Sequence, residues 1–256
     1  MNEKSDNTAL YSRYTTTATQ VNGNINDWLR SSSDYFKSHY AHLLPDHRKA
    51  RILEIGCGHG RFIKAMMGLG YSDVTGVDLS EEQVAFAKLQ LGLNNIVQAD
   101  AIEWLAENQG TFDCILVIDV FEHLDNSQLL ALTGAIYKSL ASGGRLIAQI
   151  PSGTSPINPI IFGDLTHLRA FTPRSMQQLF LNSGFEEFQF SEIAPGTYNM
   201  SNFIRYLAWC ALKPIIKAFS LLVHGGAARG SIYTSNFIAT ASKNLMHCKV
   251  DNNAKL

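Results

Sequence analysis

Cysteine is scarce in this chain, and its few cysteines are not spaced as metal ligands or as a redox pair. The 256 residues include four cysteines, and none of them forms a Cys-x-x-Cys pair. A disulfide framework and a zinc site of clustered thiolates are therefore not expected, and no metal site is assigned. Scattered cysteines of this kind suit a reducing cytoplasm, so a cytoplasmic location is expected.

The chain also lacks an excess of either charge and a long uncharged apolar run. Its formal net charge is -1 and its pI is near 6.7, so no overall positive field would attract nucleic acid. The start of the chain has no basic segment followed by an apolar run, so no signal peptide is expected. The sequence contains no run of about eighteen consecutive uncharged apolar residues, so a membrane-spanning helix is not expected either.

Apolar residues are abundant, and their pattern predicts an α/β fold. Hydrophobic residues make up 46% of the chain and charged residues 17%, which allows a sizeable buried core. Short apolar runs alternate with helical patterns between positions 51 and 150. The runs are Ile52–Ile55, Val74–Leu79, Ile96–Ala99, Phe112–Ile118 and Arg145–Ile150. This alternation predicts a parallel sheet with helices on both faces.

Two further strands are predicted near the end of the chain, at Phe185–Ile193 and Phe237–Ser242. No standard helical crossover joins them, so we expect an antiparallel pair at the sheet edge. The predicted division is a flexible segment and cap helix (1–45), a core (46–193), a helical amphipathic insertion (194–235), and a last strand with a tail (236–256).

A glycine-rich turn follows the first predicted strand. It reads Gly56-Cys-Gly58-His-Gly60 and leads into a helical pattern. Glycines permit a close backbone approach to a ligand, and a helix N-terminus favours negative charge. A dinucleotide fingerprint requires its third glycine one residue later, where this chain has Arg61. The turn therefore predicts a nucleotide-type ligand and disfavours NAD.

Three acidic residues lie in or directly after successive predicted strands. Glu54 interrupts an apolar run, where an unpaired carboxylate would cost several kcal/mol and must therefore have a partner. Asp78 ends the second strand, where a carboxylate can accept hydrogen bonds from ribose hydroxyls. Asp100 ends the third and can accept from an adenine amino group. Each acid alone could equally be a helix N-cap, but three beside a glycine turn favour a ligand site.

Taken together, these motifs resemble those of the class I methyltransferases that use S-adenosylmethionine (SAM). The resemblance runs from about Ile52 to Phe185 and includes Glu54–Gly60, Asp78, Asp100-Ala101, Phe112–Leu124 and Leu140–Pro151. It implies a Rossmann-like seven-stranded sheet whose final strand is antiparallel. It also implies SAM as the cofactor, with the methionine portion at Gly56, Gly58 and Gly60, the ribose at Asp78 and Leu79, the adenine at Asp100 and Ala101, and further contacts from Glu54, Ile118 and Asp119.

The acceptor side of the site is predicted from two segments that follow strands. His123 lies in one and His167 in the other, and histidine is suited to serve as the general base that a hydroxyl acceptor requires. We take His167 as the candidate base with His123 as support, while either histidine could instead have only a structural role. An alternative is a metal ion at Asp119, Glu122 and His123, which resemble the metal motif of some O-methyltransferases.

Residues 203–223 form a basic amphipathic pattern. The pattern places Ile204, Leu207, Ile215 and Leu222 on one face and the cations on the other, with Pro214 expected to kink or split the helix. The apolar face requires a cover, because it is too wide to be left in water. The domain's own edge, a second subunit forming a homodimer, or a peripheral membrane contact could supply it.

Other functions fit the chain less well. An NAD-dependent oxidoreductase or epimerase is disfavoured by Arg61 and by the lack of a Tyr-x-x-x-Lys pair. A non-catalytic SAM-binding module is expected to lose the ligand acids, which are all present here. An aminopropyl transferase would need an acidic cluster for its polyamine. The sequence therefore predicts a methyltransferase for a small molecule or a glycan or lipid-linked acceptor, as in polysaccharide biosynthesis.

Overall fold

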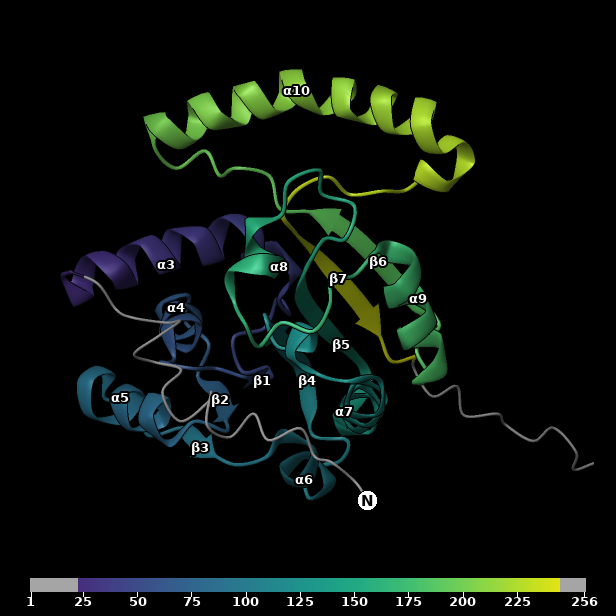
Figure 1. Cartoon of the computed structure of the whole chain (residues 1–256). Helices are drawn as coiled ribbons and strands as arrows, with labels where there is room; N and C mark the ends of the chain where they lie inside the picture. Colours follow the sequence, from purple (N-terminus) through teal and green to yellow (C-terminus); the bar gives the residue numbers. More distant parts are fainter. Residues whose placement is uncertain (1–22, 245–256) are drawn as a thin grey trace, which may run out of the picture.

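The structure is a computed structural model that describes residues 23–244, so residues 1–22 of the predicted flexible start and 245–256 of the tail lie outside it. Seven strands form one sheet in the order β3-β2-β1-β4-β5-β7-β6 (Figure 1). Only β7 is reversed, since it pairs antiparallel with both β5 and β6. The predicted fold class is confirmed. The strands are β1 (Arg51–Ile55), β2 (Asp73–Asp78), β3 (Ile96–Gln98), β4 (Phe112–Ile118), β5 (Leu140–Pro151), β6 (Glu187–Glu192) and β7 (Asn236–Ser242).

Helices cover both faces of the sheet because successive strand side chains point to opposite sides. In β4, Ile115 and Val117 pack on one face and Cys114 and Leu116 on the other. The described helices are α3 (Ile25–His39), α4 (Arg61–Gly68), α5 (Glu81–Leu91), α6 (Ala101–Ala106), α7 (Asn126–Ser139), α8 (Pro159–Gly163), α9 (Pro173–Asn182) and α10 (Met200–His224), with short 3-10 turns η1 (Ala41–Leu43), η2 (Phe121–His123) and η3 (Gly225–Ala228).

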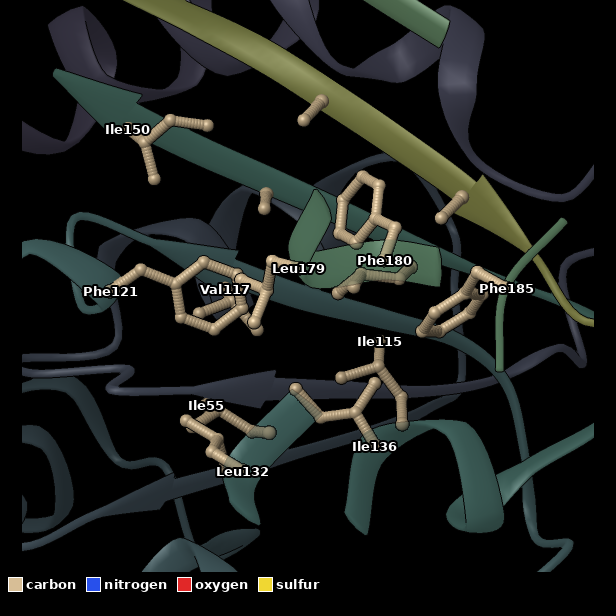
Figure 2. Packing of buried hydrophobic residues seen from close by; sticks show 14 of the residues in the cluster. Ile55, Ile115, Val117, Phe121, Leu132, Ile136, Ile150, Leu179, Phe180 and Phe185 are labelled. Atoms are coloured by element: carbon tan, nitrogen blue, oxygen red, sulfur yellow. The ribbon is translucent and has the colours of Figure 1, made fainter. Parts of the chain in front are cut away.

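Two apolar clusters hold these layers together. One lies between the sheet and helices α6, α7 and α9, where Ile136 and Phe180 are fully buried (Figure 2). The other lies under α3, α4 and α5 and includes the buried rings of Phe36 and Phe62. Burying each such side chain contributes roughly 1.5–3 kcal/mol, so both layers stabilise the sheet on which the site is built.

The segment between β6 and β7 is a single helix, α10, and this corrects the expectation that Pro214 would kink or split it. The helix is continuous across Pro214 and curves gently (Figure 1). Proline removes one N–H, which leaves the carbonyl of Cys210 without its usual helical donor. Both residues are exposed. Water can therefore bond that carbonyl, and the helix continues.

The position and composition of α10 bear on two further expectations. None of its residues is buried, so the domain's own edge does not cover the apolar face. The helix is also long and apolar enough to cross a membrane by length and composition, with a mean hydropathy of 1.5 over its most apolar window. The sequence criterion, an uninterrupted run of uncharged residues, missed this because Arg205, Lys213 and Lys217 are spread along the helix.

Candidate active site

The glycine turn joins β1 to α4 and is shaped by both backbone and packing. Gly56, Gly58 and Gly60 all have positive φ, at 68°, 54° and 77°. A Cβ added to Gly60 would lie 2.5 Å from Leu93 Cδ1, and one added to Gly56 would lie 2.3 Å from Val120 Cγ2. Larger residues are therefore excluded here by the protein's own side chains as well as by the backbone conformation.

Asp78, at the end of β2, is bonded to this turn. Its Oδ2 accepts a hydrogen bond from the Gly58 N–H at 2.7 Å, and its Oδ1 accepts one from the Ser80 N–H at 2.8 Å. Burial raises the pKa of Asp78, and these backbone bonds act in the opposite direction. The carboxylate thus positions the turn, and each of its oxygens retains capacity for a further donor.

Glu54 lies in the buried strand β1, and one of its oxygens has no partner. Within the described part of the chain, no group donates to Glu54 Oε2. Burial raises the pKa of this carboxyl from 4.5 to about 8, and the nearby charge of Arg61 only partly offsets the effect. The sequence predicted that Glu54 must have a partner. The described residues provide none for this oxygen. A cationic group of a ligand would satisfy it.

Asp100 follows β3 and serves as the N-cap of α6. Its Oδ1 accepts from the N–H groups of Ile102 and Glu103, at 2.8 and 3.2 Å. The N-cap role that the sequence left open is thus present. A hydrogen bond of 3.1 Å from Ala99 N–H to the Asp78 carbonyl joins the ends of β2 and β3, so both acids lie at the same edge of the sheet.

The remaining predicted cofactor contacts lie at this same edge. Leu79, directly after Asp78, leaves 62% of its surface exposed. Ala101 is the first residue of α6, and Ile118 is the buried last residue of β4. The fold therefore brings the predicted residues to the carboxyl ends of β1 to β4, where open α/β sheets bind ligands.

A buried polar network follows β4 and was not predicted from sequence. The Gln149 amide of β5 donates to both carboxylate oxygens of Asp119, and Asn236 Nδ2 donates to Oδ1 at 3.4 Å. The hydroxyls of Tyr35 and Tyr40, on and directly after α3, donate to Gln149 Oε1. Asp119 has a φ of 54°, the only positive value among the described non-glycine residues. The one signal in the sequence was a glutamine inside an otherwise apolar strand.

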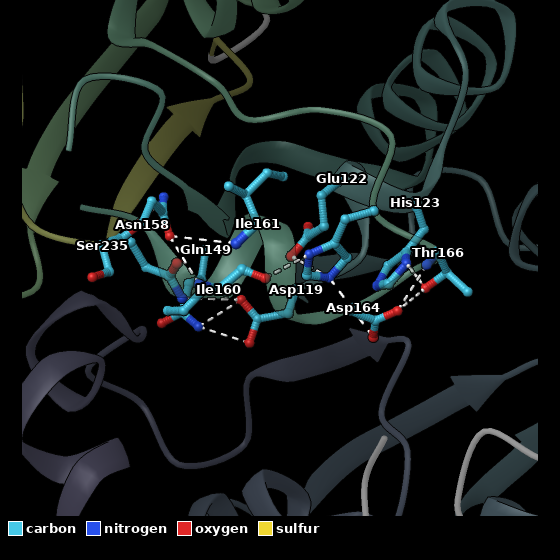
Figure 3. Close-up of polar contacts among 12 residues, drawn as sticks. Asp119, Glu122, His123, Gln149, Asn158, Ile160, Ile161, Asp164, Thr166 and Ser235 are labelled. Atoms are coloured by element: carbon cyan, nitrogen blue, oxygen red, sulfur yellow. Dashed lines mark hydrogen bonds and ion pairs between the residues drawn. The ribbon is translucent and has the colours of Figure 1, made fainter. Parts of the chain in front are cut away.

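A second group of side chains lies beside this network and comes from two segments (Figure 3). Glu122 and His123 are on η2, and Asp164 to His167 follow α8. His167 Nε2 lies 4.0 Å from Glu122 Oε1, and the two histidine rings are 4.7 Å apart. His123 Nδ1 lies 2.8 Å from Thr166 Oγ1, which donates to Asp164. The predicted pair, His123 and His167, is thus brought together, with Glu122 beside it.

Burial determines the protonation of this group. Glu122 is fully buried, and neither of its carboxylate oxygens has a hydrogen-bond donor in the described residues. Desolvation raises its pKa well above the ordinary range, and the charge of Asp119 adds to the effect. Desolvation also lowers the pKa of His123 to about 4, with a further contribution from His167. Near neutral pH, His123 is therefore an uncharged imidazole, while burial shifts the ionisation of Glu122 toward higher pH.

Metal coordination would use a different set of ligands from the sequence alternative. Glu122, His123 and His167 each offer a ligand atom, and these atoms lie within 4.8 Å of one another. Asp119, which the sequence alternative included, instead has its carboxylate bonded to Gln149. Two imidazoles and one carboxylate could hold a divalent ion.

These features define a Rossmann-like α/β protein whose candidate ligand site is built on a glycine turn and on acids at strand ends. The chain belongs to the methyltransferase domain family, whose sequence model matches residues 29–189. Helix α10 lies outside the matched residues.

Curated relatives match part of the chain. The ubiquinone biosynthesis O-methyltransferase of Xanthomonas oryzae pv. oryzae is 37% identical over 102 residues, which are 38% of this chain and 41% of that protein. The protein of the same name from Mesorhizobium japonicum is 40% identical over 82 residues, 31% of this chain and 32% of its own length. The chain thus spans less than half the length of these relatives.

Solved structures share the fold over most of the chain. A SAM-dependent methyltransferase from Archaeoglobus fulgidus superposes with a TM-score of 0.58 and 22% identity, covering 93% of this chain and all of the other. The phosphoethanolamine N-methyltransferase 2 of Haemonchus contortus, in complex with S-adenosyl-L-methionine, gives a TM-score of 0.55 at 16% identity, covering 92% of this chain and 56% of that one. The similarity extends beyond the sequence match and shows the common fold.

Proposed function

We propose that this protein is an enzyme that transfers a methyl group from SAM to a small-molecule acceptor. The observation that carries the proposal is Glu54, a buried carboxyl beside the glycine turn with an unpartnered oxygen. SAM has an ammonium group and a sulfonium, and a cationic ligand supplies the charge that a buried carboxylate requires. The buried carboxyl of Glu54 therefore fits SAM better than it fits a dinucleotide, whose pyrophosphate would bring a negative charge to this turn.

The residues proposed to hold SAM follow the edge of the sheet. The turn at Gly56 to Gly60 would receive the methionine portion next to Glu54, and Asp78 and Leu79 would receive the ribose. Asp100 and Ala101 would lie at the adenine, with Ile118 and Asp119 at the tip of β4. When bound, SAM supplies an activated methyl group, so the protein mainly has to orient an acceptor in line with it.

The acceptor is proposed to be a hydroxyl, because the curated relatives are named as O-methyltransferases. His167 is the proposed base. Its Nδ1 lies 3.0 Å from the carbonyl oxygen of Ile160, and because a carbonyl only accepts, Nδ1 holds a proton. The lone pair of the neutral ring is then on Nε2, which can remove the hydroxyl proton. Glu122, 4.0 Å from Nε2, would stabilise the imidazolium when ionised.

His123 is proposed as a supporting residue. Thr166 gives its hydroxyl proton to Asp164, so Thr166 Oγ1 is left to accept from His123 Nδ1. These bonds fix the loop that carries His167 against η2, and the Leu168 N–H adds a bond of 2.8 Å to the Glu122 carbonyl. A metal ion at Glu122, His123 and His167 is the second candidate for activating the acceptor, and it is supported by the spacing of their ligand atoms.

The exposed apolar face of α10 also bears on the acceptor and on the partners of the enzyme. A glycan or lipid-linked acceptor, as in polysaccharide biosynthesis, would suit an enzyme that works next to a membrane. The exposed apolar face of α10 supports a membrane contact, or alternatively a homodimer through residues 203–223. A cytoplasmic enzyme with peripheral attachment would combine these features. Nucleic acid is not proposed as a partner because the net charge is -1.

The proposal is tested first by ligand binding and then by turnover. S-adenosylhomocysteine and SAM should raise the melting temperature of the full chain, and NAD should not. Methyl transfer from labelled SAM would then be screened over phenols and sugar nucleotides. A melting temperature that responds to NAD and not to either SAM or its product would contradict the proposal.

A further inference from the structure

Helix α10 turns its apolar face away from the rest of the protein. The side chains that face the domain are half-buried and include Tyr206, Trp209 and Lys213. Large apolar side chains on the remaining surface are 42 to 84% exposed: Met200, Phe203, Ile204, Leu207, Leu212, Ile215, Phe219, Leu222 and Val223. An amphipathic helix of a water-soluble domain has the reverse orientation. The outward apolar face of α10, defined by these nine residues, therefore requires a cover from outside the chain.

The usual reasons for a long apolar helix do not apply to α10. A core helix would be mostly buried, whereas the most apolar window of α10 is 0% buried. A leader sequence would lie near the N-terminus, whereas α10 joins two neighbouring strands of the sheet, β6 and β7. The helix is part of the folded domain and yet exposes its apolar side.

The attachment of α10 is incompatible with crossing a membrane in this fold. Lys213, near the middle of the helix, donates to Glu192 at the end of β6 over 2.7 Å. A spanning helix would take Lys213 into the hydrocarbon or break this pair. Both ends of the roughly 37 Å helix return to the same edge of the sheet, since Glu192 of β6 pairs with Phe237 of β7. The helix therefore lies flat along the domain (Figure 1).

The charges of the segment suit an anionic surface. Residues 200–230 contain no aspartate or glutamate, and they include Arg205, Lys217 and Arg229 besides the paired Lys213. On a helical projection of about 100° per residue, Arg205 lies at one edge of the outward apolar face, about 90–100° from its middle, and Lys217 lies about 140–150° from the middle on the other side. Both are exposed. Long cationic side chains on the flanks of such a face can reach phosphate headgroups while the face itself enters the acyl region.

The same charges argue against a second copy as the cover. Two α10 helices packed face to face would bring Arg205 of each copy, at the edge of the face, against the other helix. The helix has no acidic residue to pair with it, so a second copy would not compensate this charge. A lipid surface with negative headgroups has no such conflict.

We propose that α10 lies in the plane of an anionic lipid bilayer, with its outward apolar face inserted and its Lys213 side toward the domain. This binding does not depend on the proposed methyl transfer. It would bring the edge of the sheet that carries the candidate active site next to the bilayer, because α10 and α8 both connect to the strand ends there. The exposed Phe162 and Leu165, at 88 and 86%, lie in the segment that carries His167.

The test is flotation of the full chain with vesicles. The protein should float with vesicles of phosphatidylcholine and phosphatidylglycerol, and alkaline carbonate should release it. Ile215→Glu places a charge on the outward apolar face and should weaken binding at least about tenfold. Leu89→Glu is the control, because Leu89 is an aliphatic side chain on α5 that is 81% exposed against 65% for Ile215, and this variant should bind as the wild type does. Circular dichroism and the melting temperature confirm that both variants fold.

A second pair of changes tests the charge. Arg205→Gln with Lys217→Gln should lower binding to the anionic vesicles and leave binding to pure phosphatidylcholine unchanged. Wild-type protein that ignores both vesicle types, or an Ile215→Glu variant that binds as well as the wild type, would overturn the proposal. So would resistance to carbonate extraction, which indicates a span, or a lipid-free dimer that Ile215→Glu converts to monomers.

Discussion

Gln149 and Asp119 are joined by two hydrogen bonds, in which the Gln149 amide nitrogen donates to both carboxylate oxygens at 2.8 and 2.9 Å. The other end of the same amide accepts from Tyr35 and Tyr40. One side chain thus links helix α3, strand β5 and the tip of β4. Since Asp119 directly precedes the Val120 that packs on Gly56, this link also supports the glycine turn.

Replacing Gln149 with leucine should therefore destabilise the protein. The substitution removes two of the three hydrogen bonds to the Asp119 carboxylate and the acceptor of two tyrosine hydroxyls, and we expect a loss of roughly 2–4 kcal/mol in the free energy of unfolding. Urea denaturation measures this loss. Gln177→Leu, at an exposed position on α9, is the control and should change stability by less than about 0.5 kcal/mol. Equal effects of both changes would show that the network contributes nothing.

The raised pKa of Glu54 predicts how SAM binding depends on pH. Because the carboxyl has a pKa of about 8 in the free protein and a cationic ligand favours its ionised form, binding must release a proton below that pH. The affinity for SAM should therefore rise as the pH increases from 6 to 8. Calorimetry in buffers of different ionisation enthalpy measures the released proton. Glu54→Gln should abolish the release and weaken binding, whereas the exposed Glu187→Gln should do neither.

The same carboxyl predicts the pH dependence of stability. Its pKa is about 8 in the folded protein against 4.5 for an ordinary glutamate, so the folded state holds an extra proton between these values. Stability is then lost as the pH rises through this window, because the folded protein retains a proton that the unfolded chain has released. Urea midpoints of the ligand-free protein between pH 5 and 8 should show this fall, and the fall should be smaller in Glu54→Gln. An identical slope in both proteins would contradict the assignment.

Asp78→Ala should affect both binding and folding. The change removes a proposed ribose acceptor, with an expected loss of about 1–3 kcal/mol in SAM binding. It also leaves the N–H groups of Gly58 and Ser80 without their acceptor, so the melting temperature should fall. Calorimetry and thermal unfolding give the two quantities. Asp73→Ala, at the exposed start of β2, is the control, and an unchanged SAM affinity in Asp78→Ala would refute the ribose assignment.

His167→Ala should lower kcat by roughly 10²–10⁴-fold once an acceptor is known, because a general base is lost. The Kd for SAM should change little, and the exposed His42→Ala should behave as the wild type does. His123→Ala should have a smaller effect, since His123 acts through the loop that Thr166 and Asp164 fix. Full turnover by His167→Ala would remove it from the catalytic group.

A chelator separates the two ways of activating the acceptor. If His167 acts as a base, turnover should be the same before and after treatment with EDTA and gel filtration. If Glu122, His123 and His167 bind a divalent ion, the treatment should abolish turnover and added Mg²⁺ or Mn²⁺ should restore it. The second result would replace the base mechanism with metal activation.

The sequence by itself determined the sheet, its reversed last strand and the glycine turn. These features follow from local patterns: apolar runs of strand length, glycines where φ is positive, and acids that follow strands. The sequence also identified Glu54 as a buried carboxylate in need of a partner, because an acid within an apolar run is unusual whatever surrounds it. The position of Asp78 and Asp100 at one sheet edge follows equally from their place after parallel strands.

Only the tertiary structure decided which distant residues meet. Gln149 contacts Tyr35 and Tyr40 across 114 and 109 positions of the chain, and no local pattern encodes such a pairing. Glu122 meets His167 for the same reason, since two separate loops converge after β4 and β5. The helical pattern of residues 203–223 defined two faces of α10 but not which one turns inward. The ion pair between Lys213 and Glu192 marks the inward side, because it ties Lys213 to the domain while the large apolar side chains stay exposed on the outward side.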